Sequence, residues 1–190
     1  MLANTELKKE DKNKAKCLIF LYNKMNNKKD TISYIIILLV VLIIKFYVVT
    51  PVRVNGESMY STLRDKEIMI LNELYYRFHD IKRFDIVVLK YNKSKLIKRV
   101  IGLPGETIRY EDEKLYINGE VVEENFTHKY TKDFDITKFG DKVPEDSYFV
   151  MGDNRGNSLD SRSFGFVKKK AILGRAKIVI FPFKAIRTVK

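Results

Sequence analysis

The alternation of apolar and polar positions divides this 190-residue chain into three parts. Residues 1–31 hold short apolar runs between lysines. Residues 32–49 are almost wholly apolar, and Tyr34–Ile44 reads YIIILLVVLII without interruption. Beyond residue 50 the apolar runs are short and are separated by polar turns, which is typical of β-strands. The pattern therefore predicts a basic leader, one long apolar helix and a β-rich domain.

The apolar stretch over residues 32–49 has the length of a membrane-spanning helix. Its 18 residues would span roughly 27 Å at about 1.5 Å per residue, close to the hydrocarbon thickness of a bilayer. Lys45 is its one charge, and the long stem of a lysine near the end can reach the lipid headgroups. A buried strand of this length is outside the usual range. A cleaved signal peptide is opposed by the long leader and by the absence of a small-x-small site afterwards. We expect an uncleaved anchor over residues 32–50.

The charge of the leader predicts how the anchor is oriented. Residues 1–30 carry eight lysines against four acidic residues, and lysine-rich flanks stay on the cytoplasmic side of a membrane. The expected organisation is a basic cytoplasmic leader over residues 1–31, a single-pass anchor in the cell membrane, and an extracytoplasmic domain over residues 51–190. Cys17 would then lie in a reducing compartment and would need no partner.

Short strands dominate the pattern after Thr50, and no run there combines helical period with helical length. Asn118-Gly119, between two apolar runs, is typical of a tight hairpin turn. Residues 123–141 are polar and irregular, so we expect a surface excursion there. The fold class is therefore mostly β, an antiparallel β-sheet arranged as a sandwich or a partly open barrel. The strands are expected at Ile68–Leu71, Asp85–Leu89, Leu96–Ile101, Thr107–Tyr110, Leu115–Ile117, Val121–Val122, Tyr148–Met151 and Ala176–Phe181.

Composition excludes several kinds of chemistry. The single cysteine rules out a disulfide framework and a cysteine-cluster metal site, and two histidines argue against a multi-histidine site. We expect no metal and no organic cofactor. The net charge is +12, but residues 51–190 carry 27 basic and 20 acidic side chains without a nucleic-acid motif. That excess is interpreted as a solvated surface, and no nucleic-acid partner is expected.

Composition does not exclude catalysis by a serine nucleophile, which needs a base to accept the proton of its hydroxyl. His79 lies in a run of bulky residues and His128 in the polar excursion, so both are interpreted as surface or packing residues. A serine can instead be activated by a lysine that is held neutral. The candidate serine is Ser58, because Gly56 two residues before it would let a substrate backbone approach closely. A serine in an ordinary turn is the alternative.

Lys98 is the candidate base. If its segment is a strand, it shares one face with Leu96 and Val100. Burial between these aliphatic side chains would lower the pKa of the lysine, as a general base near neutral pH requires. The alternative is an edge-strand lysine that points into water.

A third segment, Gly152–Gly165, follows an apolar run and is dense in small and polar residues. Side chains in such a loop can satisfy its backbone by hydrogen bonds. Asp160 and Arg162 are spaced to form a bidentate pair that braces it. An ordinary solvated turn is the alternative, although it explains this clustering of Asn, Asp, Arg and Ser poorly.

Together, these three segments resemble type I signal peptidases, the membrane-bound Ser/Lys proteases, in their short, single-anchor Gram-positive form. The resemblance covers most of residues 32–182, and its most specific motif is intact from Gly152 to Arg162. It implies Ser58 as the nucleophile, Lys98 as the general base, and Ser158 as a hydrogen-bond partner of Lys98. It also implies a supporting ion pair between Asp160 and Arg162, and it assigns to the substrate and oxyanion region Gly56, Met59, Gly152 and Asp153.

The resemblance also implies a β-rich catalytic core with a small variable β insertion, here at about residues 106–144. The implied partners are the signal peptides of exported preproteins, cut after small-x-small sites, and the lipid bilayer, with no metal. This sequence departs from the usual pattern at three positions. Ser61 stands where the family has proline, Phe84 where it has glycine, and Glu106 where it has aspartate.

Three other functions compete with this one. A non-catalytic membrane-tethered relative would lack Ser58 or Lys98, and both are present. A membrane-anchored nucleic-acid binder is opposed by the expected export of the domain. A cytosolic, self-cleaving repressor-type Ser/Lys protease is opposed by the anchor and by the lack of a preceding DNA-binding helical region.

Overall fold

A computed structural model of the chain describes residue 16, residues 29–42 and residues 49–189. The chain forms two compact units, Met1–Phe46 and Tyr47–Lys190. In the first unit, residues 29–42 form a helix whose apolar side chains are largely exposed. Within the described ranges, none of the helices has both the length and the apolar character needed to cross a membrane. Most of the expected leader (1–15 and 17–28) and part of the expected anchor (43–48) lie outside the described residues.

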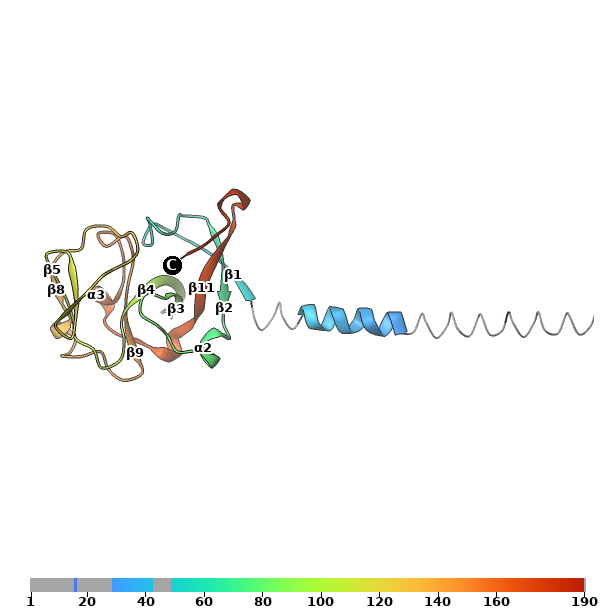
Figure 1. Ribbon diagram of the computed structural model, residues 1–190, viewed down its shortest axis with the longest axis horizontal. Helices are drawn as coiled ribbons and strands as arrows, with labels where there is room; N and C mark the ends of the chain where they lie inside the picture. The colour runs from blue at the N-terminus through green and yellow to red at the C-terminus, as the bar shows by residue number, and fades with distance from the viewer. Residues whose placement is uncertain (1–15, 17–28, 43–48, 190) are drawn as a thin grey trace, which may run out of the picture. The chain divides into compact units, whose positions relative to one another are not determined.

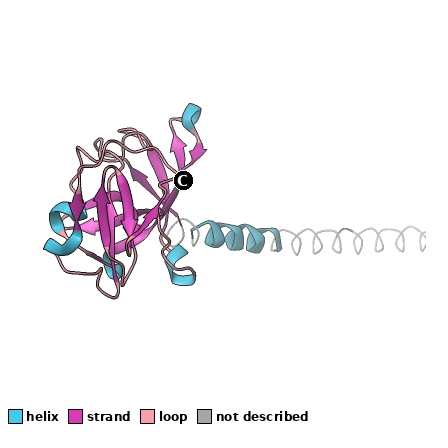
Figure 2. Cartoon of the chain, turned by 60° about the vertical axis from the view of Figure 1, so that its left-hand side comes forward, coloured by secondary structure: helices cyan, strands magenta, loops and turns pink. Residues whose placement is uncertain are grey.

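The second unit is built on a large antiparallel sheet with the strand order β1-β2-β11-β3-β4-β9-β10, and β12 also pairs with β11 (Figures 1 and 2). The outer strands β1 and β10 are not paired with each other, so the sheet stays open. The antiparallel β fold expected from the sequence is confirmed, without closure into a barrel. The strands are β1 Val49–Arg53, β2 Ile68–Asn72, β3 Ile86–Tyr91, β4 Ser94–Gly102, β9 Ser147–Met151, β10 Val167–Lys168, β11 Ile172–Phe181 and β12 Arg187–Thr188.

A smaller sheet with the order β7-β6-β5-β8 lies between β4 and β9 in the sequence, inside the range expected for an insertion. Asn118 and Gly119 connect β6 to β7 with φ angles of 52° and 86°, and such positive values suit the Asn-Gly turn that the sequence predicts. The strands are β5 Ile108–Glu111, β6 Lys114–Ile117, β7 Glu120–Val122 and β8 Phe134–Asp135, and the short helices of this unit are α2 Tyr75–Phe78, α3 Ser161–Phe164, η1 Ile136–Lys138, η2 Lys169–Ala171 and η3 Phe183–Ala185.

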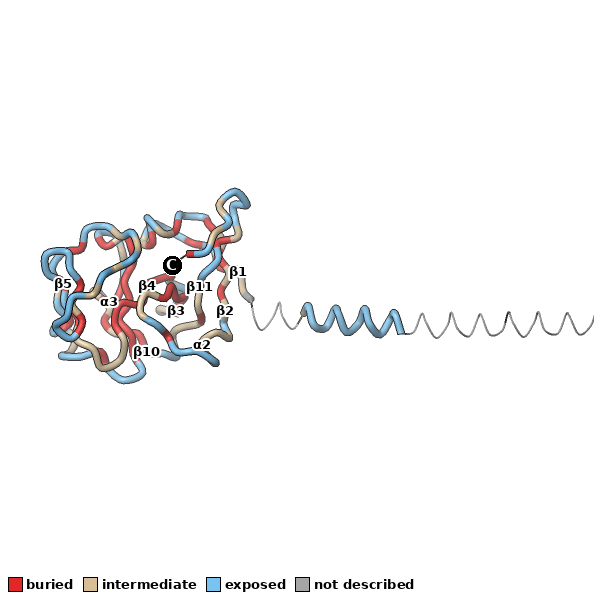
Figure 3. Tube along the Cα trace, in the orientation of Figure 1, coloured by how far each residue is buried: buried red, intermediate tan, exposed pale blue. Residues whose placement is uncertain are grey.

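Strands β3, β4 and β9 form the buried centre of the large sheet (Figure 3). Their apolar side chains pack on both faces, because each face of the sheet is covered by its own cluster of buried residues. One of these clusters joins Ile101, Phe149 and Met151 of the large sheet to Ile108 and Leu115 of the small one. The small sheet is thus packed directly on the strands that carry the candidate site.

The polar segment after β7 lies mostly at the surface, as the sequence predicts, but it is also attached to the domain. Thr131 and Ile136 are buried there, and residues 124–131 contact the loops that carry Ser58 and Asp153. Glu124 and Thr131 pair with the buried Arg155 of the loop after β9, and Glu124 also accepts a hydrogen bond from Tyr110 of the small sheet.

Candidate active site

The Ser58 loop is closed at its base by two backbone hydrogen bonds between Val54 and residues 66–67, of 2.8 and 2.9 Å. Met59 and Leu63 anchor it in the core and are almost fully buried. Gly56 has a φ of +85° and donates its N–H to Asp65 Oδ1 at 2.8 Å, and this positive φ is favourable only for glycine. These contacts hold Ser58 half-exposed at the surface of a rigid loop.

Lys98 lies near the middle of β4, between β3 and β9. Its side chain is 1% exposed, so the alternative of a water-facing edge lysine is wrong. The Nζ atom reaches the Ser58 Oγ at 2.7 Å. The structure therefore brings together the two residues that the sequence singled out, although they are 40 positions apart.

Burial lowers the pKa of Lys98 to about 8. The carboxylates of Asp160 and Asp153 oppose this effect, and the Arg162 guanidinium adds to it. No carboxylate within the described ranges comes close enough to Lys98 to form an ion pair. Roughly one molecule in ten then holds a neutral amine at pH 7, compared with fewer than one in a thousand for an ordinary lysine.

The segment after β9 supports the Ser58 loop from behind. Asn154 donates its backbone N–H to the Ser58 carbonyl and its side-chain Nδ2 to the Glu57 carbonyl, both at 3.0 Å. A Cβ at Gly152 would collide with the Ser158 side chain and with the Ser58 carbonyl oxygen. Only glycine permits this close approach, so Gly152 and Ser158 lie directly against the Ser58 loop.

Asp160 and Arg162 form the bidentate pair expected from their spacing. Arg162 Nε and Nη2 donate to the two Asp160 oxygens at 2.9 and 2.8 Å. The buried carboxylate also accepts the backbone N–H of Gly152 at 3.0 Å and caps α3. Burial raises the pKa of Asp160, but the hydrogen bond and charge of Arg162 outweigh it, so the pKa is lowered overall. The pair fixes the turn that carries Ser158.

Ser158 is the one site residue whose expected contact is missing. Its Oγ is buried, yet the structure gives it no hydrogen bond with Lys98; it lies close enough to the Asp160 carboxylate to help lower the pKa of that group. Lys98 donates to Ser58 instead. Ser158 therefore lies against the Ser58 loop, with Asp160 rather than Lys98 as the polar neighbour of its hydroxyl.

Asp153 lies behind the site and faces Arg99, the residue after Lys98. The two side chains are fully buried and form a bidentate ion pair, with nitrogen–oxygen distances of 2.9 and 2.8 Å. The Thr62 hydroxyl adds a hydrogen bond to the same carboxylate. Asp153 thus ties β4 to the Ser58 loop, and it does not face the substrate and oxyanion region where the resemblance placed it.

Two of the departures from the family pattern have a backbone explanation. Ser61 has a φ of 95°, which the ring of a proline cannot adopt. Its hydroxyl donates to the Thr127 carbonyl at 2.7 Å. Phe84 has a φ of 68°, in the region that glycine adopts without strain. The third departure, Glu106, forms a bidentate ion pair with Arg83.

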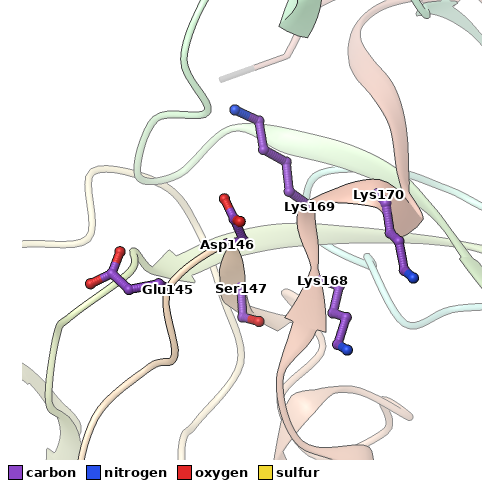
Figure 4. Close-up of a pocket in the computed structure, with 6 residues that line it drawn as sticks. All are labelled: Glu145, Asp146, Ser147, Lys168, Lys169 and Lys170. Carbon is purple, nitrogen blue, oxygen red and sulfur yellow. The ribbon is translucent and has the colours of Figure 1, made fainter.

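A hollow away from Ser58 and Lys98 lies at the β9–β10 pair. It is lined by Glu145–Ser147 and Lys168–Lys170. In Figure 4 the side chain of Lys169 extends in the opposite direction from those of Lys168 and Lys170. The hollow contains none of the site residues that the sequence singled out. Across the described ranges, no three His, Cys, Asp or Glu side chains are grouped to hold a metal ion.

Comparison with known proteins identifies the family. Residues 28–181 match the family described as signal peptidase, peptidase S26. The chain belongs to this family. The family assignment confirms the resemblance to type I signal peptidases seen in the Ser58, Lys98 and Gly152–Arg162 segments.

The similar signal peptidases come from Gram-positive bacteria. Signal peptidase I T of Bacillus subtilis (strain 168) is 40% identical over 180 residues, covering 86% of this chain and 93% of that protein. A signal peptidase I of Bacillus amyloliquefaciens is 43% identical over 166 residues, covering 83% and 90%. A crystal structure of a signal peptidase I from Enterococcus faecalis V583 is 41% identical, covers 51% of this chain and 97% of that chain, and has a TM-score of 0.48.

Three features of this signal peptidase site were missed by sequence reasoning: Arg99, Asn154 and the contacts of residues 124–131. Arg99 had a detectable signal, because an arginine inside an apolar run falls on the strand face opposite Lys98 and must be paired if the strand is central. Asn154 and residues 124–131 had none, because their partners are backbone groups far away in the sequence.

Proposed function

We propose that this chain is a membrane-bound serine endopeptidase that removes signal peptides from exported preproteins after small-x-small sites. Ser58 is the nucleophile and Lys98 the general base. The observation that carries this assignment is the 2.7 Å contact between Lys98 Nζ and Ser58 Oγ, formed by a lysine that is 1% exposed. Family membership supports the reaction, and this geometry supports the residues.

In the first step, neutral Lys98 accepts the Ser58 proton while the Oγ atom forms a bond to the scissile carbonyl carbon. The carbonyl oxygen becomes an oxyanion. The Lys98 ammonium then gives its proton to the amine that leaves, so that the peptide bond breaks and an ester remains on Ser58. Water, deprotonated by Lys98, attacks this ester and releases the signal peptide with a free carboxyl end.

The oxyanion needs a hydrogen-bond donor near Ser58. The Ser58 N–H is available, since no backbone carbonyl among the described residues accepts it. Gly56 adds no hydroxyl, but its lack of a side chain leaves open space beside the loop for the substrate backbone. Met59 is buried beneath the loop and keeps this donor in place.

Ser158, Asp160 and Arg162 act in support. The Asp160–Arg162 pair holds the turn against Gly152, and Ser158 is kept beside Ser58 by that turn. We infer that the Ser158 hydroxyl turns to Lys98 when the amine becomes charged, since it carries a hydrogen-bond acceptor and no charge.

Membrane attachment completes the proposal. The apolar residues 32–50 anchor the protein, the lysine-rich residues 1–31 stay in the cytoplasm, and residues 51–190 act outside the membrane. The apolar sequence of the anchor and the charge of the leader support this topology. An anchored enzyme meets its substrate where the cut site emerges from the bilayer, which raises the local substrate concentration.

The test is cleavage of a preprotein with an Ala-x-Ala site by the full chain in detergent, with amino-terminal sequencing of the product. We expect a single cut after the second alanine and no cleavage by Ser58→Ala. Because the pKa of Lys98 is about 8, kcat/KM should rise about tenfold per pH unit below pH 8 and level off above it.

Turnover by Ser58→Ala above a few per cent of the wild-type rate would remove Ser58 as the nucleophile. A kcat/KM that stays flat between pH 6 and pH 9 would remove Lys98 as the titrating base. Orientation is tested separately, by adding a protease to intact spheroplasts. Digestion should remove the part after Thr50 and spare the leader.

A further inference from the structure

Residues 124–131, here called the strap, run from the small sheet across to the Ser58 loop. The Ser61 hydroxyl donates to the Thr127 carbonyl at 2.7 Å. The Lys129 N–H donates to the Asp153 carbonyl at 2.9 Å. The strap is therefore attached both to the loop of the nucleophile and to the segment that supports this loop.

The strap is also fixed from below by a buried polar cluster. Arg155 forms an ion pair with Glu124, and the two side chains are 0% and 5% exposed. The same guanidinium donates to the Tyr110 and Thr131 hydroxyls, both at 2.9 Å. The Nε atom of Arg155 is buried without a partner, but breaking the ion pair would leave an uncompensated buried charge, which is costly. The strap thus has one fixed position beside the active site.

An open groove of about 600 Å³ lies between the strap and the Ser58 loop. Tyr60 and Tyr130 are 47% and 62% exposed beside it, although large aromatic side chains usually bury most of their surface. The groove is next to the nucleophile, because Glu57 precedes Ser58 in the chain. It is lined by Glu57, Tyr60, Lys129, Tyr130, Asn154 and Gly156.

The Lys129 ammonium is the cation of this groove. It lies 5.3 Å from the centre of the Tyr60 ring, and no carboxylate in the described ranges forms an ion pair with it. Glu57, the one acidic side chain of the lining, belongs to the opposite wall next to the nucleophile. A carboxylate bound in the groove would therefore be favoured at the strap and disfavoured close to the cut bond.

The chemistry of the groove indicates which part of the substrate it takes. Small side chains before the cut need shallow apolar pockets, whereas this lining is polar and charged. Resting on the proposed function, we propose that the groove binds the segment that follows the cut bond, the first residues of the released protein. In this assignment Lys129 pairs with an acidic side chain of that segment, and the two tyrosines flank its backbone.

The test measures kcat/KM for preproteins that are identical except for one residue. Asp, Asn or Lys is placed in turn at each of the first six positions after an Ala-x-Ala cut and, as a comparison, at the variable position before it. We expect Asp to exceed Lys by about fivefold at one or two positions after the cut, the size of one partly exposed charge pair. Added salt should reduce this preference.

Lys129→Glu should reverse the preference at those positions. Lys132→Glu is the matched control, since Lys132 is exposed, lies three residues away, makes the same change in net charge and does not line the groove. It should leave the Asp-to-Lys ratio unchanged. Melting temperatures of both variants establish that each is folded.

Equal shifts in Lys129→Glu and Lys132→Glu would show a general field effect and overturn the proposal. So would a charge preference that appears only before the cut, or no preference at any position. The substrates with Asn distinguish failure of the proposed function from failure of the groove assignment. If wild type cleaves none of the Asn substrates, the proposed function itself fails, whereas cleavage of all of them without a charge preference overturns only the groove.

Discussion

Lys98 and Arg99 are consecutive residues of β4 that the protein buries in opposite ways. Both are almost fully buried, and each points to its own face of the sheet. Arg99 has a bidentate carboxylate partner in Asp153, a hydrogen bond to the Phe84 carbonyl and the Phe126 ring 3.8 Å from its guanidinium carbon. Lys98 has a neutral partner, the Ser58 hydroxyl, to which its Nζ donates a hydrogen bond.

The difference separates a charge that stabilises the fold from the group that we propose as the general base. A guanidinium stays protonated at all working pH values, so a buried arginine has to be paired. A buried lysine can lose its proton instead. By withholding a carboxylate from Lys98 and giving one to Arg99, the protein lets one of two adjacent basic residues lose its proton near neutral pH. Five substitutions test this contrast.

Lys98→Arg should have the largest effect. The guanidinium cannot accept the Ser58 proton, so kcat/KM should fall by about 10²–10⁴-fold. An active Lys98→Arg enzyme would show that the base lies elsewhere.

Lys98→Met should be equally inactive but more stable. The pKa of Lys98 in the fold lies below its unfolded value, so the folded state is penalised below about pH 8 and relieved between pH 8 and 10.5. At pH 7 the gain should be on the order of 2–3 kcal/mol, measured by urea unfolding, and it should shrink as the pH rises to 10.5. Lys95→Met, at an exposed lysine of the same strand, is the control and should change stability little.

Arg99→Met should be the most destabilising change. It leaves the Asp153 carboxylate buried without its partner, which costs about 3–5 kcal/mol. Urea unfolding measures the loss. The double variant Arg99→Met/Asp153→Leu should recover at least half of it, because no unpaired charge remains. Equal stability of the single and double variants would contradict the role given to this pair.

Asp160→Asn should have an intermediate effect on stability and should lower the pKa of Lys98. The Asp160 charge raises the pKa of Lys98, and the Arg162 charge lowers it. Removing the carboxylate should therefore lower the pKa of Lys98 and shift the acidic limb of the pH–rate profile to lower pH. Stability should fall by about 1–3 kcal/mol, since the Gly152 N–H loses a charged acceptor. An acidic limb that stays in place or moves to higher pH would contradict this effect of the Asp160 charge on the pKa of Lys98.

Arg109→Ala sets the lower end of the scale. Arg109 and Glu111 form an ion pair at 2.8 Å, with both side chains about half-exposed. Such pairs contribute less than about 1 kcal/mol, so unfolding in urea should barely change. If Arg109→Ala lowered the free energy of unfolding as much as Arg99→Met, burial would not decide how much these ion pairs contribute to stability.

Local pattern was enough to predict most strands and to single out Ser58 and Lys98 as candidates, whereas their roles came from the resemblance to a known family. Alternation placed Lys98 on a strand face with Leu96 and Val100, and Asn118-Gly119 marked the hairpin, because both signals depend on neighbours in the sequence. The Asp160–Arg162 pair was predictable for the same reason, since its partners are two positions apart.

What the pattern could not predict depends on distant partners. Whether Lys98 is central or at an edge is decided by β9, which pairs with β4 from the next residues, Arg99↔Met151 and Val100↔Val150. The missing hydrogen bond of Ser158 and the strap contact of Ser61 depend on side-chain positions fixed only by tertiary packing. Polar composition alone made the strap resemble a solvated loop.

The support of the Ser58 loop by Asn154 forms late in the synthesis of the chain. Asn154 bonds to Glu57 across 97 residues. A nascent chain that has just passed Lys98 carries both Ser58 and Lys98, but not the segment after β9 that supports the Ser58 loop. Because a chain is made from its amino end, this support of the Ser58 loop is absent until residue 154 has been made.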